Sequence, residues 1–223
     1  MLKNIKNRHE NEQVEFLKQT IKSKAMTDKF LKAKHWQLFV LTFGIPLIFQ
    51  LFMIGSVISD IAVHENPDPA MMFKFMKFFP VIMILYLAVF FGWHWSVAIG
   101  LQKKVPENVT MKVKKFKVFF FIPLIYLIIF LMVFSVFMNG LFNLNQEPDF
   151  GLIGGLFAVI VPLHFFAMFC IFYSLYFVAK TFKTVELQRE VKFGDFAGEF
   201  FMIWFYPIGI WIIQPKINKM VEE

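Results

Sequence analysis

The chain has 223 residues, 58% of them hydrophobic, with a formal net charge of +7 and a mean hydropathy of +0.60. This composition excludes an ordinary soluble domain, and the charges collect between long apolar runs. The lysines therefore indicate membrane topology and anionic lipid, and nucleic acid is not an expected partner.

Residues 1–37 form a polar, basic segment with nine Lys or Arg and no apolar signal-peptide core. No helix-breaking residue occurs over 10–34, which predicts a basic amphipathic helix. One interpretation places this helix on an anionic cytoplasmic leaflet, and the other leaves it solvated, with lysines that only fix topology. The residues near its apolar face are Val14, Leu17, Ile21, Ala25 and Leu31.

Residues 38–101 are predicted to form a first transmembrane hairpin, with spans near 36–63 and 78–101. Trp36 is an interfacial anchor at the start of the first span. Pro46 lies inside that span, where a proline indicates a tolerated kink. The connector between the spans contains two prolines and cannot continue a helix.

Residues 102–117 contain six lysines and are expected to form a basic cytoplasmic loop. Residues 118–179 follow as a second hairpin, because each of its two apolar runs exceeds the roughly 20 residues that a spanning helix needs. Gly151 and Gly155 have the spacing that permits close helix packing, although glycine is common in membrane helices.

Residues 180–223 begin with a charged connector and continue with 14 apolar residues, 200–213. This run is short for a span, so the prediction is a re-entrant or interfacial half-helix at the cytoplasmic face. Its aromatic residues are the favoured partner contacts. The candidates are Trp204, Tyr206, Pro207 and Trp211.

The basic residues alternate between connectors and so predict the orientation. The N-terminal segment, residues 102–117 and residues 180–199 carry nine, six and four, whereas the other two connectors carry two and none. The N-terminus is therefore expected in the cytoplasm. The 21 Lys against two Arg, together with 33 Phe, favour an AT-rich bacterial genome and hence a bacterial inner membrane. The predicted fold class is all-α integral membrane, with four spans in two tandem hairpins.

Similar proline environments occur in the two hairpins and indicate an internal repeat. Pro46 stands in Gly-Ile-Pro-Leu-Ile and Pro123 in Phe-Ile-Pro-Leu-Ile, while Val-Ala pairs end the second and fourth runs. The alternative is that prolines recur by chance in Phe-rich helices. If the repeat is real, Pro46 and Pro123 occupy matching packing positions.

No Asp, Glu, Lys or Arg lies in the central part of a predicted span, and no hydrolase, metalloprotease or phosphate-loop motif occurs. An enzyme is therefore not expected, nor is a metal or cofactor. Four histidines at two depths are weak haem candidates, since paired histidines ligate b-type haems; interfacial or packing roles are the alternative. They are His35 and His94 near the inner face, and His64 and His164 near the outer face.

The favoured function is a non-enzymatic accessory or structural subunit that acts through other membrane proteins or through copies of itself. The alternative is a homo-oligomeric channel or carrier for a small solute, with the prolines as hinges. A second alternative is a haem-binding electron-transfer subunit.

Overall fold

The computed structural model describes residues 2–63, 75, 78–142 and 150–222, and this part of the chain is helical, with no strand in it. The elements are α1 (Leu2–Lys32), α2 (His35–Phe39), the π-helix η1 (Val40–Gly44), α3 (Ile45–Val63), α5 (Phe79–Trp95), the π-helix η2 (Ser96–Gly100), the 3₁₀-helix η3 (Leu101–Lys104), α6 (Val113–Phe142), α7 (Phe150–Leu187), α8 (Phe193–Trp204) and α9 (Tyr206–Glu222).

Four helical segments of the described chain are long and apolar enough to cross a membrane: His35–Val63, Phe79–Lys104, Val113–Val136 and Phe157–Leu187. The prediction of an all-α protein with four such helices is therefore confirmed. The pairing of these helices into two tandem hairpins stays a prediction. The predicted connector around residues 64–77 and the turn at 145–149 lie largely or wholly outside the described residues.

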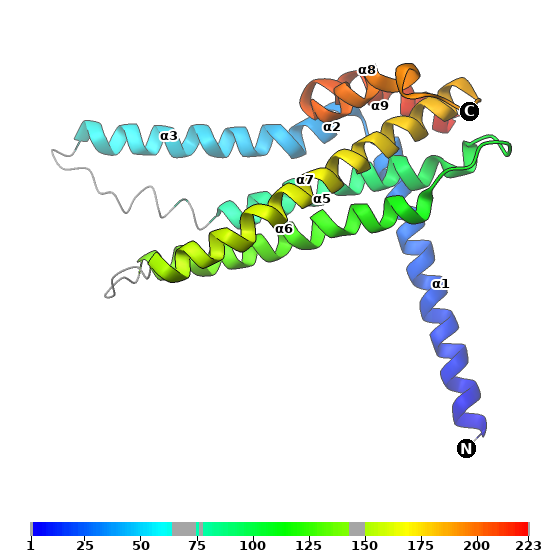
Figure 1. The fold of residues 1–223 in the computed structure, drawn as a ribbon, viewed down its shortest axis with the longest axis horizontal. Coiled ribbons are helices and arrows are strands. Elements are labelled where there is room, and N and C mark those ends of the chain that lie inside the picture. Colours follow the sequence, from blue (N-terminus) through cyan, green and yellow to red (C-terminus); the bar gives the residue numbers. More distant parts are fainter. Residues whose placement is uncertain (1, 64–74, 76–77, 143–149, 223) are drawn as a thin grey trace.

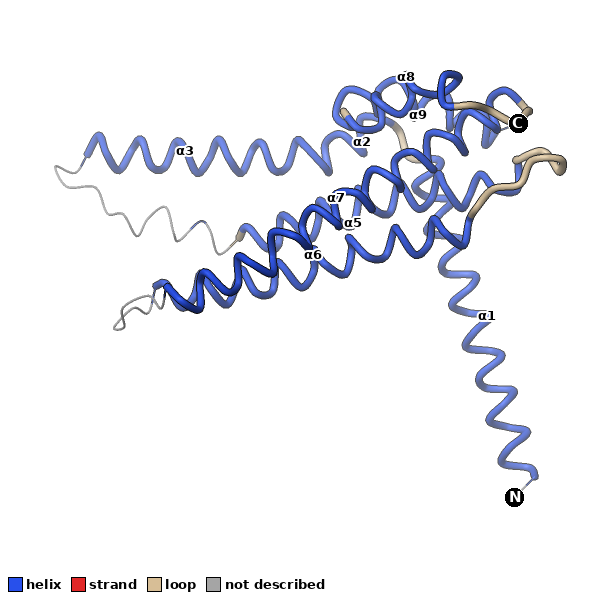
Figure 2. The backbone as a smooth tube through the Cα atoms, in the orientation of Figure 1, coloured by secondary structure: helices blue, strands red, loops and turns tan. Residues whose placement is uncertain are grey.

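The four apolar helical segments do not all pack against one another to the same extent. Helices α6 and α7 pack along each other, and α5 lies beside them, whereas α3 leads away from this group (Figure 1). Helix α1 runs across the direction of the spans. Helix α2, η3, the start of α6 and the end of α7 lie at the same end of the four spans (Figure 1), and we call this end of the molecule the basic end. The described loops 105–112 and 188–192 also lie there (Figure 2).

A π-helix precedes Pro46 and explains why the first span stays continuous. Proline has no N–H, and its ring clashes with the carbonyl four residues earlier, here that of Thr42. In η1 the N–H of Ile45 bonds the Val40 carbonyl, five residues back. This wider turn accommodates the proline. The Thr42 hydroxyl in turn donates to the Leu38 carbonyl at 2.7 Å.

Helices α8 and α9 fold back on each other at Phe205, which has φ −84° and ψ 56°. A Cβ on Gly209 would overlap the backbone carbonyl of Met202, so only glycine fits this approach. Residues 200–213, expected as one half-helix, are thus divided between two helices. The break falls before Pro207, which stands in the first turn of α9, where proline is tolerated.

The core lies at the basic end. Phe116 of α6 stacks on Phe177 of α7 with ring centroids 4.7 Å apart. The two Val-Ala pairs of the sequence, Val97-Ala98 and Val178-Ala179, are each fully buried. Since η2 packs against α7, these small side chains allow two spans to approach closely. Whether the pairs descend from a duplication stays a prediction.

Candidate functional site

The structure places the histidines in separate surroundings. His35 lies beside Trp211, with ring centroids 4.6 Å apart, and His164 shares a 3.1 Å hydrogen bond with the Tyr126 hydroxyl. His94 is buried, and its Nδ1 lies 2.6 Å from the Phe90 carbonyl. His64 lies outside the described residues. Among the described side chains no group of three or more His, Cys, Asp or Glu is placed to hold a metal ion.

The predicted partner contacts divide into exposed and buried residues. Trp204 and Trp211 are exposed, at 46% and 47%. Tyr206 is buried against Trp93, with centroids 5.3 Å apart, and Pro207 is half-buried. Of these four candidates, the two tryptophans are therefore the most accessible to a partner.

The residues predicted for helix packing also differ. Pro123 is buried within α6 and Pro46 is half-buried. A Cβ at Gly155 would meet no described atom within 4 Å, so no close helix approach is visible there. Gly151 lies in α7, and its surroundings fall outside the part of the chain that the structure describes.

Gln214 of α9 joins three parts of the chain at the basic end. Its Oε1 accepts a 2.6 Å hydrogen bond from the Trp93 indole N–H. Its Nε2 donates to the carbonyls of Phe30, Leu31 and Ala33 at 3.2, 3.1 and 2.7 Å. Phe30 and Leu31 lie in the last turn of α1, and Ala33 follows its end. The last carbonyls of a helix lack the usual intrahelical partner, and here, apart from the Ala33 N–H that reaches the Phe30 carbonyl at 3.3 Å, a side chain supplies it. We call this arrangement the Gln214 clamp.

One turn further along α9, Asn218 strengthens the same junction. Its Nδ2 donates to the carbonyls of Leu31 and Ala33 at 2.8 and 3.2 Å. Gly100 completes the contact, because a Cβ there would lie 2.6 Å from the side chain of Leu31. The end of α1 is therefore fixed on η2 and α9.

A charge network connects α7, α8 and α9. The Lys183 ammonium donates to Glu186 at 2.6 Å and to Glu199 of α8 at 2.8 Å. Lys216 of α9 reaches Glu186 at 3.0 Å. The side chains of Lys183 and Glu199 are only 17% and 10% exposed. Because partly desolvated ion pairs with several hydrogen bonds require a defined geometry, this network fixes the α8–α9 hairpin on α7.

The start of α8 carries a separate, exposed ion pair. Arg189 reaches Asp195 with both terminal nitrogens, at 3.0 and 3.3 Å, and Asp195 also accepts the Lys192 backbone N–H at 2.8 Å. The hydrogen bond from Arg189, followed by that from Lys192, lowers the pKa of the Asp195 carboxyl. The carboxylate also suits the positive end of the helix dipole.

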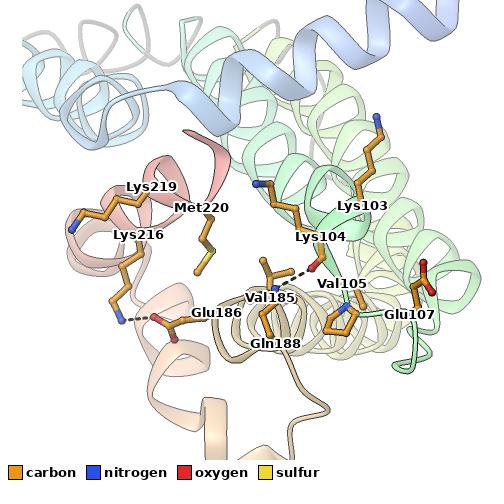
Figure 3. A pocket seen from close by; sticks show the side chains of 11 residues that line it. Lys103, Lys104, Val105, Glu107, Val185, Glu186, Gln188, Lys216, Lys219 and Met220 are labelled. Atoms are coloured by element: carbon orange, nitrogen blue, oxygen red, sulfur yellow. Dashed lines mark hydrogen bonds and ion pairs between the residues drawn. The ribbon is translucent and has the colours of Figure 1, made fainter. Parts of the chain in front are cut away.

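A pocket of about 700 Å³ opens at the basic end between the 103–107 segment, the end of α7 and α9 (Figure 3). Its charged residues are four lysines and two glutamates: Lys103, Lys104, Lys216, Lys219, Glu107 and Glu186. Gln188 holds two of the walls together, since its Nε2 donates to the Lys104 carbonyl at 3.2 Å and to the Val185 carbonyl at 2.7 Å.

Sequence reasoning missed the Gln214 clamp, the charge network and the pocket. The signal available was Gln214 itself, an uncharged polar residue directly after the apolar run 200–213. No protein-family model, curated protein or solved structure matches this chain.

Proposed function

We propose that the chain is a non-enzymatic, multi-pass membrane protein that serves as a structural subunit of a larger membrane assembly, with a second copy of itself as its first partner. The proposal includes the orientation read from the lysines, with the basic end in the cytoplasm of a bacterial cell. The α8–α9 hairpin then enters the membrane from the cytoplasmic side and returns to it.

The observation that carries the proposal is the position of Gln50. This residue lies midway along the apolar segment His35–Val63, and its side chain is exposed. Within the described residues its amide has no hydrogen-bond partner. An amide facing hydrocarbon is costly unless another helix satisfies it, and for this reason glutamine promotes helix association in membranes.

The residues around Gln50 extend this face into a seam. The seam consists of apolar residues that follow one another, with Gln50 among them, at alternating spacings of four and three residues, as in the a and d positions of a coiled coil. These residues are Phe43, Leu47, Ile54, Val57 and Ile61. All are exposed except Val57, which is half-buried. The rings of Phe49 and Phe52, about 100° and about 160° around α3 from Gln50, both contact the ring of Phe75, with centroids 6.4 and 5.9 Å apart. The seam therefore points away from the rest of the molecule.

A second α3 is the occupant that fits this seam best. A glutamine amide carries a donor with partial positive charge and an acceptor with partial negative charge. Two Gln50 side chains at the same depth of a parallel pair are therefore complementary to each other. The apolar seam residues are then placed to pack in alternating layers, and a polar residue at one such position sets the register.

Disulfide trapping in native membranes tests this interface. Cys170 is buried and is first replaced, as Cys170→Ser. We expect Ile54→Cys, on the seam, to form a disulfide-linked dimer, and Ser59→Cys, which is also exposed but on another face, to form none. Adding Gln50→Leu to the Ile54→Cys chain is expected to reduce the dimer several-fold. Equal trapping at both positions, or none at either, would contradict the proposal.

Partner identification tests the wider role. The protein is extracted gently from the native membrane, and co-purifying chains are identified by mass spectrometry. A stoichiometric second protein that is lost with Gln50→Leu supports a subunit built on the α3 dimer. A stable monomer without partners would remove the basis for the proposal.

A further inference from the structure

The pocket at the basic end has an excess of positive charge that the protein does not neutralise. Glu186 is already engaged, by Lys183 at 2.6 Å and by Lys216 at 3.0 Å. Figure 3 shows the Lys104 side chain extending across the opening toward α9, whereas Lys103 and Lys219 extend outward from the walls on which they stand. No described residue forms an ion pair with any of the three. The lining thus carries three lysines without an ion pair in the described structure against Glu107 alone, and its net charge is positive.

The walls are held by the fold rather than by the lysines themselves. Lys103 and Lys104 form the 3₁₀-helix that ends the second span, and Lys219 stands on α9. Lys216 ties α9 to Glu186 of α7, while Gln188 ties α7 to the Lys104 carbonyl. Gln188 has a left-handed backbone, with φ 50°, a conformation that ends α7. The pocket is therefore a built cavity and not a chance meeting of mobile side chains.

The depth of the pocket indicates the kind of anion that it takes. Lys104 and Glu186 lie in the last turns of two segments long enough to cross the membrane, so the opening is at headgroup level. Val105, Val185 and Met220 give it an apolar lining beside the lysines. A phosphate group next to a hydrocarbon portion matches this combination, and basic pockets between spanning helices bind acidic headgroups.

We propose that this pocket binds the phosphate group of an acidic phospholipid, held by Lys104 and by Lys219, whose long side chain can turn toward the opening. The volume of about 700 Å³ accommodates a headgroup with its glycerol, within the usual range of small-molecule sites. Long lysine side chains reach a phosphate as rotatable point charges without a fixed fork geometry. The bound lipid would fasten the end of α7 to α9 at the point where the Gln214 clamp and the charge network also meet.

The test uses the full chain in nanodiscs and detergent, with native mass spectrometry counting retained lipid. The wild-type protein is expected to keep one phosphatidylglycerol through delipidation and to release phosphatidylcholine. The double variant Lys104→Gln/Lys219→Gln should bind phosphatidylglycerol roughly 30-fold more weakly, about fivefold for each lysine. The control Lys112→Gln/Lys114→Gln removes the same charge from exposed positions outside the pocket and should bind as the wild type does.

Two further measurements keep the result interpretable. Lys104→Arg/Lys219→Arg should retain the lipid, and this separates lost charge from lost folding. Inorganic phosphate alone, titrated into lipid-free protein in detergent, distinguishes the source: saturable millimolar binding that the glutamine variant loses supports the same site with a soluble anion. Equal retention by the two glutamine double variants, or equal retention of phosphatidylglycerol and phosphatidylcholine, would overturn the proposal.

Discussion

At the basic end, helices from both termini of the chain meet around fully buried residues such as Trp93, Gln214 and Ile217, whereas α3 buries none of its 19 residues. Both regions are rich in apolar and aromatic side chains. The difference lies in their polar contacts. The basic end carries the Gln214 clamp and the charge network, while the amide of Gln50 on α3 has no partner within the described residues.

This difference in polar contacts matters because the surrounding solvent of a membrane-spanning helix is lipid. In a bilayer, lipid tails are as apolar as leucine, so apolar surface gives helices little reason to associate. Close backbone approach, hydrogen bonds and ion pairs then decide which helices hold together. The basic end has all three, and it fixes the fold. Helix α3 has an apolar face and, within the described residues, an amide without a hydrogen-bond partner, which is the basis of the proposed contact with another chain.

The sharpest way to break the packed region is to open the turn between α8 and α9. We expect Gly209→Ala to cost at least about 3 kcal/mol, the upper end of overpacking, because the clash is with backbone at Met202 and not with a side chain that can rotate. Thermal unfolding in detergent measures the loss. Gly198→Ala on α8 is the control, since its Cβ meets no described atom within 4 Å, and it should be neutral or stabilising.

The same substitution placed in each region tests the comparison directly. Gln214→Leu removes the partner of the buried Trp93 N–H, and we expect a loss of about 2 kcal/mol. Gln50→Leu removes no described contact, so the stability of the monomer should change by less than about 0.5 kcal/mol. Denaturation of both variants under identical conditions gives the two values. Equal losses would show that the two regions are held in the same way.

The four spans could be predicted from sequence because length and hydropathy alone determine them. The uneven packing of these helices could not be predicted from the sequence. Apolar runs around α3 and α6 look alike, and only the three-dimensional contacts show that Phe116 is fully buried while Leu51 is 60% exposed. The break at Phe205 within the expected half-helix could not be predicted either, since the nearby Pro207 stands in a first helical turn, where proline is tolerated.

The candidate site was the least predictable part. The Gln214 clamp joins residues 93 and 214, and the charge network joins 183 and 199; neither pair follows a local motif. Positive charge near residues 102–117 was evident, but its convergence with α9 depends on the α8–α9 turn. The histidines were haem candidates by residue type alone. In the structure His35, His94 and His164 each have a different neighbour.

The charge network offers a smaller perturbation of the packed region. Glu199→Gln leaves Lys183 with Glu186 as its remaining carboxylate, and we expect a loss of about 1 kcal/mol, reduced from that of a fully buried pair because both side chains retain some exposure. Chemical denaturation of the protein in detergent measures it. Glu190→Gln, at an exposed position without an ion pair in the described structure, should have no effect. A similar loss of unfolding free energy in both variants would show that the charge network does not stabilise the packed region.

The smallest expected effect is the pH dependence of the exposed pair at the start of α8. Arg189 lowers the pKa of Asp195 in the folded protein, so the stabilisation is present above the unfolded pKa of about 3.9 and is lost as the pH falls through the folded value. Asp195→Asn should therefore melt slightly below the wild type at pH 6, and the two melting temperatures should converge under acid. High salt should narrow the gap at pH 6, because both groups face solvent. A gap that widens on acidification would mean that Asp195 is stabilised in its protonated form, and that this exposed pair adds nothing to the packed end of the molecule.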